Sequence, residues 1–176
     1  MIDKNIYEEL PDWPKIPNEL LPGISDIENM QNNSPITGYT NFQQFAFKIP
    51  EIENIIKDYI SFDIKGKTYF QVVKNEIPIH IDKGRDIIYN YLFSTGGKEV
   101  YTVFYENDKT TEKFRVKIPL HTWHRMDVSN YHTVLGLEYT RAAVTIHEIL
   151  KVKRPAEINK YADGRVDKTI TYHNKK

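Results

Sequence analysis

The sequence predicts a mainly β protein whose strands form a sandwich or a double-sheet jelly roll. Residues 67–148 are rich in Tyr, Phe, Val, Ile and Thr, the residue types that favour strands. Turn signals containing Gly, Asn or Asp divide this stretch into short segments. No helical pattern separates those segments, and short strands in close succession are typical of double-sheet β folds. We expect eight strands, at residues 68–73, 77–81, 86–94, 100–106, 113–118, 123–128, 132–137 and 141–149.

The residues before this stretch predict an N-terminal arm followed by a helix. Apolar residues such as Trp13 and Leu21 favour an arm that packs over the core. Residues 50–60 place apolar side chains at helical spacing behind Pro50, and proline is favourable in the first turn of a helix. Regular structure before residue 40 is broken up by five prolines, Pro11, Pro14, Pro17, Pro22 and Pro35.

At 176 residues, the chain is expected to form a single domain. Its parts would be the arm and helix at 1–64, the β core at 65–149 and a polar C-terminal extension at 150–176. Within the extension, Asp163-Gly164 could turn a small hairpin, and a mobile tail is the alternative.

Composition narrows the function classes. Basic and acidic residues number 24 each, which disfavours electrostatic binding to nucleic acid. The chain has no cysteine, so any metal must be held by His, Asp or Glu. The N-terminus lacks the apolar region of a signal peptide, and no apolar run is long enough to span a membrane. We therefore expect a cytoplasmic protein without a membrane partner.

A short motif, His80-Ile-Asp82, carries the first candidate metal ligands. Residues two apart on a strand point to the same face, so this imidazole and this carboxylate would lie together. The pair alone is a weak signal, because it could equally be an exposed ion pair. A second histidine on a neighbouring strand would complete one face of an octahedral ion and leave the opposite face open. That ligand set is typical of non-haem Fe(II) oxygenases.

Three histidines compete for the third ligand position: His121, His124 and His132. We favour His132, because only this residue follows the turn Asp127-Val-Ser-Asn130 and precedes an arginine by nine residues. His124 would then be a surface imidazole or a residue that orients a ligand. The arginine, Arg141, is a fixed cation that could hold an acidic cosubstrate. An ion pair with Glu138 is the alternative for Arg141.

In order and spacing, His80-x-Asp82, His132 and Arg141 resemble the 2-oxoglutarate/Fe(II)-dependent oxygenases. The small aspartyl/asparaginyl-hydroxylase-like and phage-type members are the most similar, because a turn of the form Asp-x-Ser-x-x-His carries their distal histidine. The resemblance covers about residues 65–149. It implies a double-stranded β-helix, a distorted cupin-like jelly roll of two antiparallel sheets, with the arm and one or two helices against the larger sheet.

The resemblance also implies a role for each candidate site residue. His80, Asp82 and His132 would ligate Fe(II). Arg141 would bind the distal carboxylate of 2-oxoglutarate through its planar guanidinium. Several branches of the family have a serine two residues past the arginine, where this chain has Ala143, so another hydroxyl would complete the site. The open candidates for it are Tyr89, Tyr91 and Tyr101, and Arg85 could also contact cosubstrate or substrate.

Together these inferences predict an enzyme, a dioxygenase acting as a hydroxylase, that uses Fe(II), 2-oxoglutarate and O2. It would convert 2-oxoglutarate to succinate and CO2 and hydroxylate an unidentified prime substrate, either a protein side chain or a small molecule. One alternative is a jelly-roll binding or structural protein without catalysis. Another is a cupin-type metalloenzyme that does not use 2-oxoglutarate, although the usual cupin pattern begins with His-x-His, which this sequence lacks.

Overall fold

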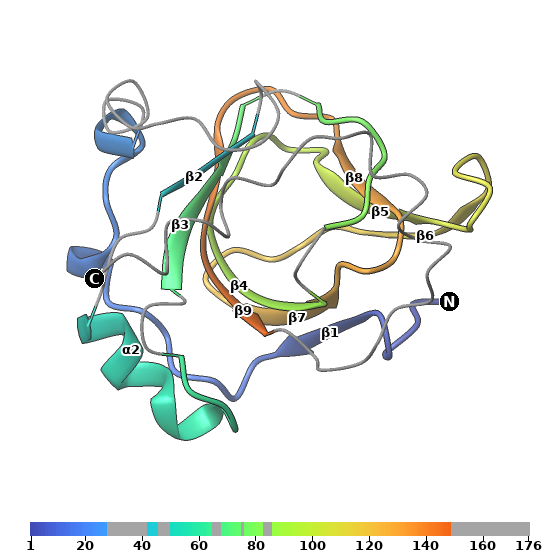
Figure 1. Ribbon diagram of the computed structural model, residues 1–176. Coiled ribbons are helices and arrows are strands. Elements are labelled where there is room, and N and C mark those ends of the chain that lie inside the picture. Colours follow the sequence, from blue (N-terminus) through green and yellow to red (C-terminus); the bar gives the residue numbers. More distant parts are fainter. Residues whose placement is uncertain (28–41, 46–49, 65–67, 75, 83–85, 149–176) are drawn as a thin grey trace, which may run out of the picture.

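The alternation of apolar residues in the second half of the chain produces two antiparallel β-sheets that face each other (Figure 1). The computed structural model describes residues 1–27, 42–45, 50–64, 68–74, 76–82 and 86–148. The C-terminal extension, with its expected hairpin or tail, lies outside the described residues. In the described part of the chain, no helix is both long enough and apolar enough to cross a membrane.

Six strands of the described chain form the larger sheet, in the order β1-β7-β4-β9-β3-β2, with every neighbouring pair antiparallel. They are β1 (Tyr7–Leu10), β2 (Phe42–Phe45), β3 (Thr68–Val73), β4 (Ile87–Thr95), β7 (Trp123–Asp127) and β9 (Arg141–Glu148). In the smaller sheet, β5 (Tyr101–Tyr105) pairs with β6 (Glu112–Val116) and β8 (His132–Leu135). This architecture confirms the predicted mainly β jelly roll.

The strand predicted at 77–81 is wrong. In this segment only His80 forms a β-bridge, and its partner is His132 of β8. A proline at position 78 has no backbone N–H to donate, so regular pairing through it is disfavoured. The segment is therefore held to the smaller sheet at isolated points rather than along a ladder.

Apolar side chains from both sheets fill the space between them. The rings of Phe104 and Phe114, on neighbouring strands of the smaller sheet, stack with their centroids 4.9 Å apart. We call the face of the larger sheet that points toward this core its inner face. The residues it contributes to the core include Ile88, Leu92, Met126 and Ala143.

The outer face of the larger sheet is also buried, under the N-terminal arm and helix α2 (Pro50–Ile56), as Figure 1 shows. Two short 3-10 helices, η1 (Asn18–Leu20) and η2 (Lys57–Tyr59), flank this layer. The ring of Trp13 stacks on Tyr89 with centroids 5.3 Å apart. The indole N–H of Trp123 donates to the Pro14 carbonyl oxygen at 2.9 Å. The arm therefore contacts the sheet through both apolar packing and a directional hydrogen bond.

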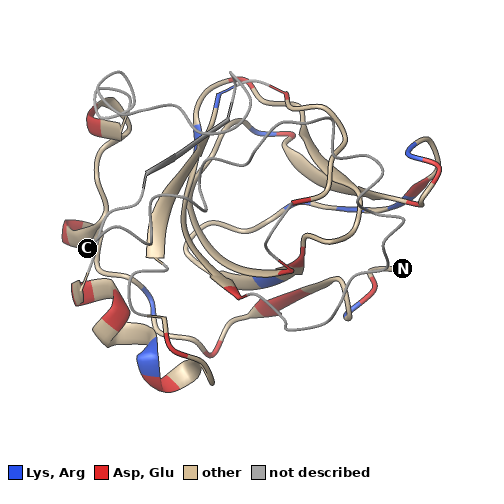
Figure 2. Ribbon diagram, in the orientation of Figure 1, with Lys and Arg blue, Asp and Glu red and all other residues tan. Residues whose placement is uncertain are grey.

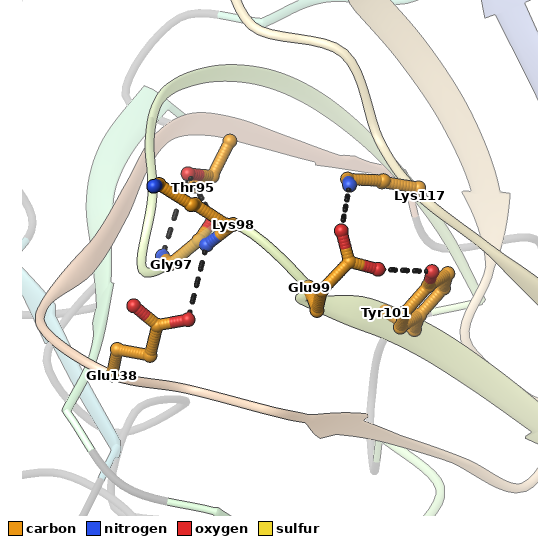
Figure 3. Close-up of polar contacts among 7 residues, drawn as sticks. All are labelled: Thr95, Gly97, Lys98, Glu99, Tyr101, Lys117 and Glu138. Atoms are coloured by element: carbon orange, nitrogen blue, oxygen red, sulfur yellow. Dashed lines mark hydrogen bonds and ion pairs between the residues drawn. The ribbon is translucent and has the colours of Figure 1, made fainter.

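Acidic and basic residues are interspersed along the described ribbon (Figure 2), consistent with the balanced composition. On the surface of the smaller sheet, Glu99 accepts hydrogen bonds from Lys117 at 2.7 Å and from the Tyr101 hydroxyl at 2.6 Å (Figure 3). Exposed pairs of this kind are screened by solvent and contribute little to stability. The fold therefore depends on its two apolar layers rather than on surface charge.

Gly136 allows the chain to turn sharply after β8. Its φ is +80°, in the left-handed region, and a Cβ at this position would lie only 2.2 Å from the carbonyl oxygen of Glu99. Both the torsion and the close backbone approach require glycine.

We expect Gly136→Ala to lower the free energy of unfolding by at least about 2 kcal/mol, because an alanine here is strained and meets backbone atoms. Urea denaturation of the two proteins measures this change. The matched control is Gly23→Ala, where the nearest atom to the new Cβ would be a side-chain oxygen of Asp26 at 3.1 Å, which can move aside. Equal effects of the two substitutions would contradict the assignment.

Candidate metal centre

The structure brings together His80, Asp82 and His132. One potential ligand atom from each of the three lies within 4.8 Å of the others. The His80 Nε2 atom is 3.4 Å from an Asp82 carboxylate oxygen, and the two imidazole centroids are 4.5 Å apart. The carboxylate and His132 are buried, whereas His80 is half-buried. Two imidazoles and one carboxylate gathered at this spacing can hold one face of an octahedral metal ion.

Backbone hydrogen bonds hold the three residues in place. His80 and His132 exchange a reciprocal pair, with N···O distances of 3.0 and 2.8 Å. The Asp82 N–H donates to the Val128 carbonyl oxygen at 2.9 Å. Between these points the chain turns at Asp127, whose carboxylate accepts from the backbone N–H of Ser129 at 3.0 Å. The turn predicted from the sequence thus brings His132 back toward His80.

Both histidines use Nδ1 in the same way. In His80, Nδ1 lies 2.8 Å from the Pro78 carbonyl oxygen, and in His132 it lies 2.9 Å from the Asn130 carbonyl oxygen. A carbonyl can only accept, so each Nδ1 carries the proton and each Nε2 keeps its lone pair. Metal-binding histidines commonly have this arrangement, because the backbone acceptor fixes the tautomer and the ring orientation. The donor set therefore fits a divalent metal such as Fe(II).

Arg141 opens β9 and lies on the inner face of the larger sheet. It is 6% exposed, and an Nη atom donates to the Thr102 hydroxyl of β5 at 3.2 Å. Burial lowers the pKa of Arg141 to about 10, so the guanidinium remains charged at neutral pH. No Asp or Glu of the described chain forms an ion pair with it. Glu138, the expected alternative partner, instead accepts from the Lys98 backbone N–H at 3.3 Å (Figure 3).

Contacts between the turn at Gly96 and the residues before β9 fix the position of the Arg141 backbone and Cβ. The Gly96 carbonyl oxygen accepts from the backbone N–H groups of Glu138 at 2.7 Å and Tyr139 at 2.9 Å. A Cβ at Gly96, where φ is +83°, would lie 2.9 Å from the Cβ of Arg141. The β4–β5 turn and the start of β9 are therefore in close contact.

The sequence did not predict that Tyr7 of β1 and His124 of β7 would lie in the surroundings of Arg141. Their rings lie 5.8 Å apart, and the charge of Arg141 affects the pKa of both. Burial, followed by the nearby Arg141 charge, lowers the pKa of His124 to about 3, while the Thr122 backbone acts in the opposite direction. His124 is therefore neither a surface residue nor part of the His80–Asp82–His132 group.

The three tyrosines that were candidates for the additional hydroxyl have other surroundings in the described structure. Tyr91 is buried on the outer face, where its ring packs 5.3 Å from Trp123. Tyr89 belongs to the same outer layer, and Tyr101 donates to Glu99 at the surface. The hydroxyl that contacts Arg141 in the described structure is that of Thr102. Arg85 lies outside the described residues, so its contact with cosubstrate or substrate stays a prediction.

The buried His124 should make stability depend on pH in a specific way. It stays neutral in the folded protein but takes up a proton on unfolding once the pH falls below about 6.5. The unfolded state then binds more protons, so stability falls as the pH decreases. Between pH 7 and 5, we expect wild type to lose about 2 kcal/mol more free energy of unfolding than His124→Gln, because each proton contributes about 1.4 kcal/mol per pH unit. Urea denaturation at both pH values measures this, and parallel losses would show that His124 titrates normally.

No protein-family model matches the sequence, and no curated protein matches it. Solved structures do resemble the fold. One is a prolyl hydroxylase from Trichoplax adhaerens in complex with a peptide fragment of the hypoxia inducible factor oxygen degradation domain. It is 14% identical, with a TM-score of 0.59, over 82% of this chain and 84% of that one. Another is an oxidoreductase of the 2OG-Fe(II) oxygenase family from Burkholderia pseudomallei. It is 10% identical, with a TM-score of 0.51, over 86% of this chain and 90% of that one. The chain therefore has the double-stranded β-helix fold that these oxygenases share.

Proposed function

We propose that this protein is an Fe(II)- and 2-oxoglutarate-dependent oxygenase that hydroxylates a protein side chain or a small molecule. The observation that carries the proposal is the presence, in one jelly roll, of a His-Asp-His group and a buried arginine without an ion-pair partner among the described residues. The first fits a divalent metal, and the second fits a carboxylate. The likeness to oxygenase structures supports the same reading at the level of the fold.

In this proposal, His80 and His132 hold Fe(II) through Nε2, and Asp82 holds it through its carboxylate. The backbone acceptors of Pro78 and Asn130 hold the Nδ1 protons and orient both rings, so that Nε2 is the nitrogen that can bind the metal. When bound, Fe(II) would supply the redox chemistry by which O2 and 2-oxoglutarate yield succinate, CO2 and a hydroxylated substrate. The protein contributes the fixed ligands and a largely buried setting.

Arg141 would bind the distal carboxylate of 2-oxoglutarate, assisted by the Thr102 hydroxyl. A buried guanidinium is costly without an anion, as its lowered pKa indicates, and a bidentate carboxylate would offset that cost. Ala143, two residues further along the same face of β9, has only a methyl group and is part of the apolar core there. The hydroxyl for which Tyr89, Tyr91 and Tyr101 were candidates is thus assigned to Thr102 in this proposal.

Replacing Asp82 should abolish stoichiometric metal binding. We expect Asp82→Ala to stay folded but to lose Fe(II) binding in anaerobic calorimetry, because two histidines alone leave the ligand set incomplete. The control is Asp58→Ala, which removes an exposed carboxylate from η2 and should bind Fe(II) like wild type. Unchanged metal content in Asp82→Ala would rule out the assigned ligands.

Replacing Arg141 should weaken cosubstrate binding without affecting the metal. A hydrogen bond to a charged group is worth about 1.5–3 kcal/mol, so Arg141→Ala should bind 2-oxoglutarate at least about tenfold more weakly. An anaerobic titration with Fe(II) and then 2-oxoglutarate, followed by the visible metal-to-ligand charge-transfer band, measures both events. Arg115→Ala, at an exposed site on β6, is the control.

The same titration of the wild-type protein distinguishes the proposal from its alternatives. A saturable band that needs both components supports a 2-oxoglutarate oxygenase. Fe(II) binding without a band would favour a cupin-type enzyme. Absence of metal binding would favour a non-catalytic jelly-roll protein.

A further inference from the structure

His124 is a fully buried polar side chain whose ring nitrogens lack ordinary hydrogen bonds. It is 0% exposed, and within the described residues neither Nδ1 nor Nε2 has a partner at full hydrogen-bonding distance and angle, although the nearby Thr122 backbone acts to raise the pKa of the ring. The strand register places it between Asn90 of β4 and Glu9 of β1. The Asn90 Oδ1 atom is likewise buried and without a hydrogen bond among the described residues. Most buried polar atoms have partners, so such a site requires an explanation.

The neighbours of His124 point to a ligand on the inner face. A neutral imidazole always carries one N–H donor, and burying that donor without an acceptor is unfavourable. Tyr7, whose ring lies 5.8 Å from that of His124, forms no hydrogen bond with it, and the Tyr7 hydroxyl donates to Glu9 Oε1 at 3.3 Å. Arg141 is on β9, which like β7 pairs with β4, and its guanidinium reaches across the interior to Thr102. This guanidinium, whose charge lowers the pKa of His124, can only donate. A donor next to a buried cation calls for a shared acceptor that is an anion.

We propose that His124 is a specificity-determining residue that donates its ring N–H to the same carboxylate as Arg141. This inference rests on the proposed function and adds to it a residue of the cosubstrate site. Arg141 supplies charge from β9, Thr102 supplies a hydroxyl from β5, and His124 supplies a neutral directional donor from β7. The three strands would thus surround the second carboxylate of a 2-oxo dicarboxylic acid.

A buried water molecule bridging His124 and Asn90 is the competing explanation, because such waters commonly satisfy unpaired polar groups. The two explanations differ in one respect. A water bridge would make His124 important for stability only, whereas a contact with the carboxylate would make it important for discrimination between acids.

The test compares two acids of equal chain length, 2-oxoglutarate and 2-oxopentanoate, which lacks the second carboxylate. Their affinities for the full-length Mn(II)-loaded protein are measured by calorimetry, in direct or competition format. We expect wild type to prefer 2-oxoglutarate, and His124→Phe to reduce this preference about tenfold or more, since a hydrogen bond to a charged group is lost. His121→Phe, at a half-buried histidine in the loop before β7, should leave the preference unchanged.

The outcomes separate the inference from the function on which it rests. If wild type shows no preference for 2-oxoglutarate, the proposed function fails and the inference fails with it. If wild type shows the preference and His124→Phe keeps it in full, only the role of His124 is overturned, and the water bridge explains the residue.

A second measurement needs no substitution at the site and so does not depend on how the variant folds. In protein labelled with 15N-histidine and loaded with diamagnetic Zn(II), saturating 2-oxoglutarate should shift the protonated ring nitrogen of His124. The same concentration of 2-oxopentanoate should not. The His124→Asn spectrum assigns the signal, and equal responses to the two acids would overturn the inference.

Discussion

The structure depends most on the reciprocal backbone hydrogen bonds between His80 and His132. These two bonds attach a segment that cannot form a regular strand to the edge of the smaller sheet. They also place both imidazoles side by side, while the neighbouring bond from Asp82 to Val128 adds the carboxylate. Thr133 strengthens the attachment, because its hydroxyl donates to the Ile77 carbonyl oxygen at 2.5 Å in a buried position. One local pairing thus closes the jelly roll and forms the candidate metal centre.

The larger sheet is apolar on its outer face and mixed on its inner face. The outer side packs under the arm and α2, in a cluster that includes Trp123, Val144 and Ile146. The inner side carries apolar residues next to buried polar ones, among them Asn90, His124, Arg141 and Thr145. Burying polar groups opposes folding, and each large apolar side chain buried on the outer side contributes about 1.5–3 kcal/mol in favour. The arm and helix therefore offset the cost of burying these polar residues.

Sequence reasoning predicted the parts of the site that have a local signature. The spacing of His80, Asp82 and His132 and the turn at Asp127 are short-range patterns, and the structure brings these residues together. Tyr89 and Tyr91 are two residues apart on β4 and so share a face, but the sequence does not tell which face points inward, because both faces of β4 are buried. The environment of His124 depends on the pairing of β1 with β7, and no local pattern links segments so far apart. The segment at 77–81 was predicted as a strand from composition, although its only bridge is at His80.

The pairing of β1 with β7 has a consequence for the order in which the protein folds. Tyr7 lies opposite Met126, more than a hundred residues later in the chain, whereas β7 can pair with β4 over a much shorter loop. Long-range contacts close larger loops and form more slowly, so β1 is expected to dock onto a sheet edge that already exists. The His80–Asp82–His132 group can form without the pairing of β1 with β7. A chain emerging from the ribosome would therefore keep its N-terminal strand unpaired until β7 had been synthesised, and the side of the interior that contains Tyr7 would stay open until then.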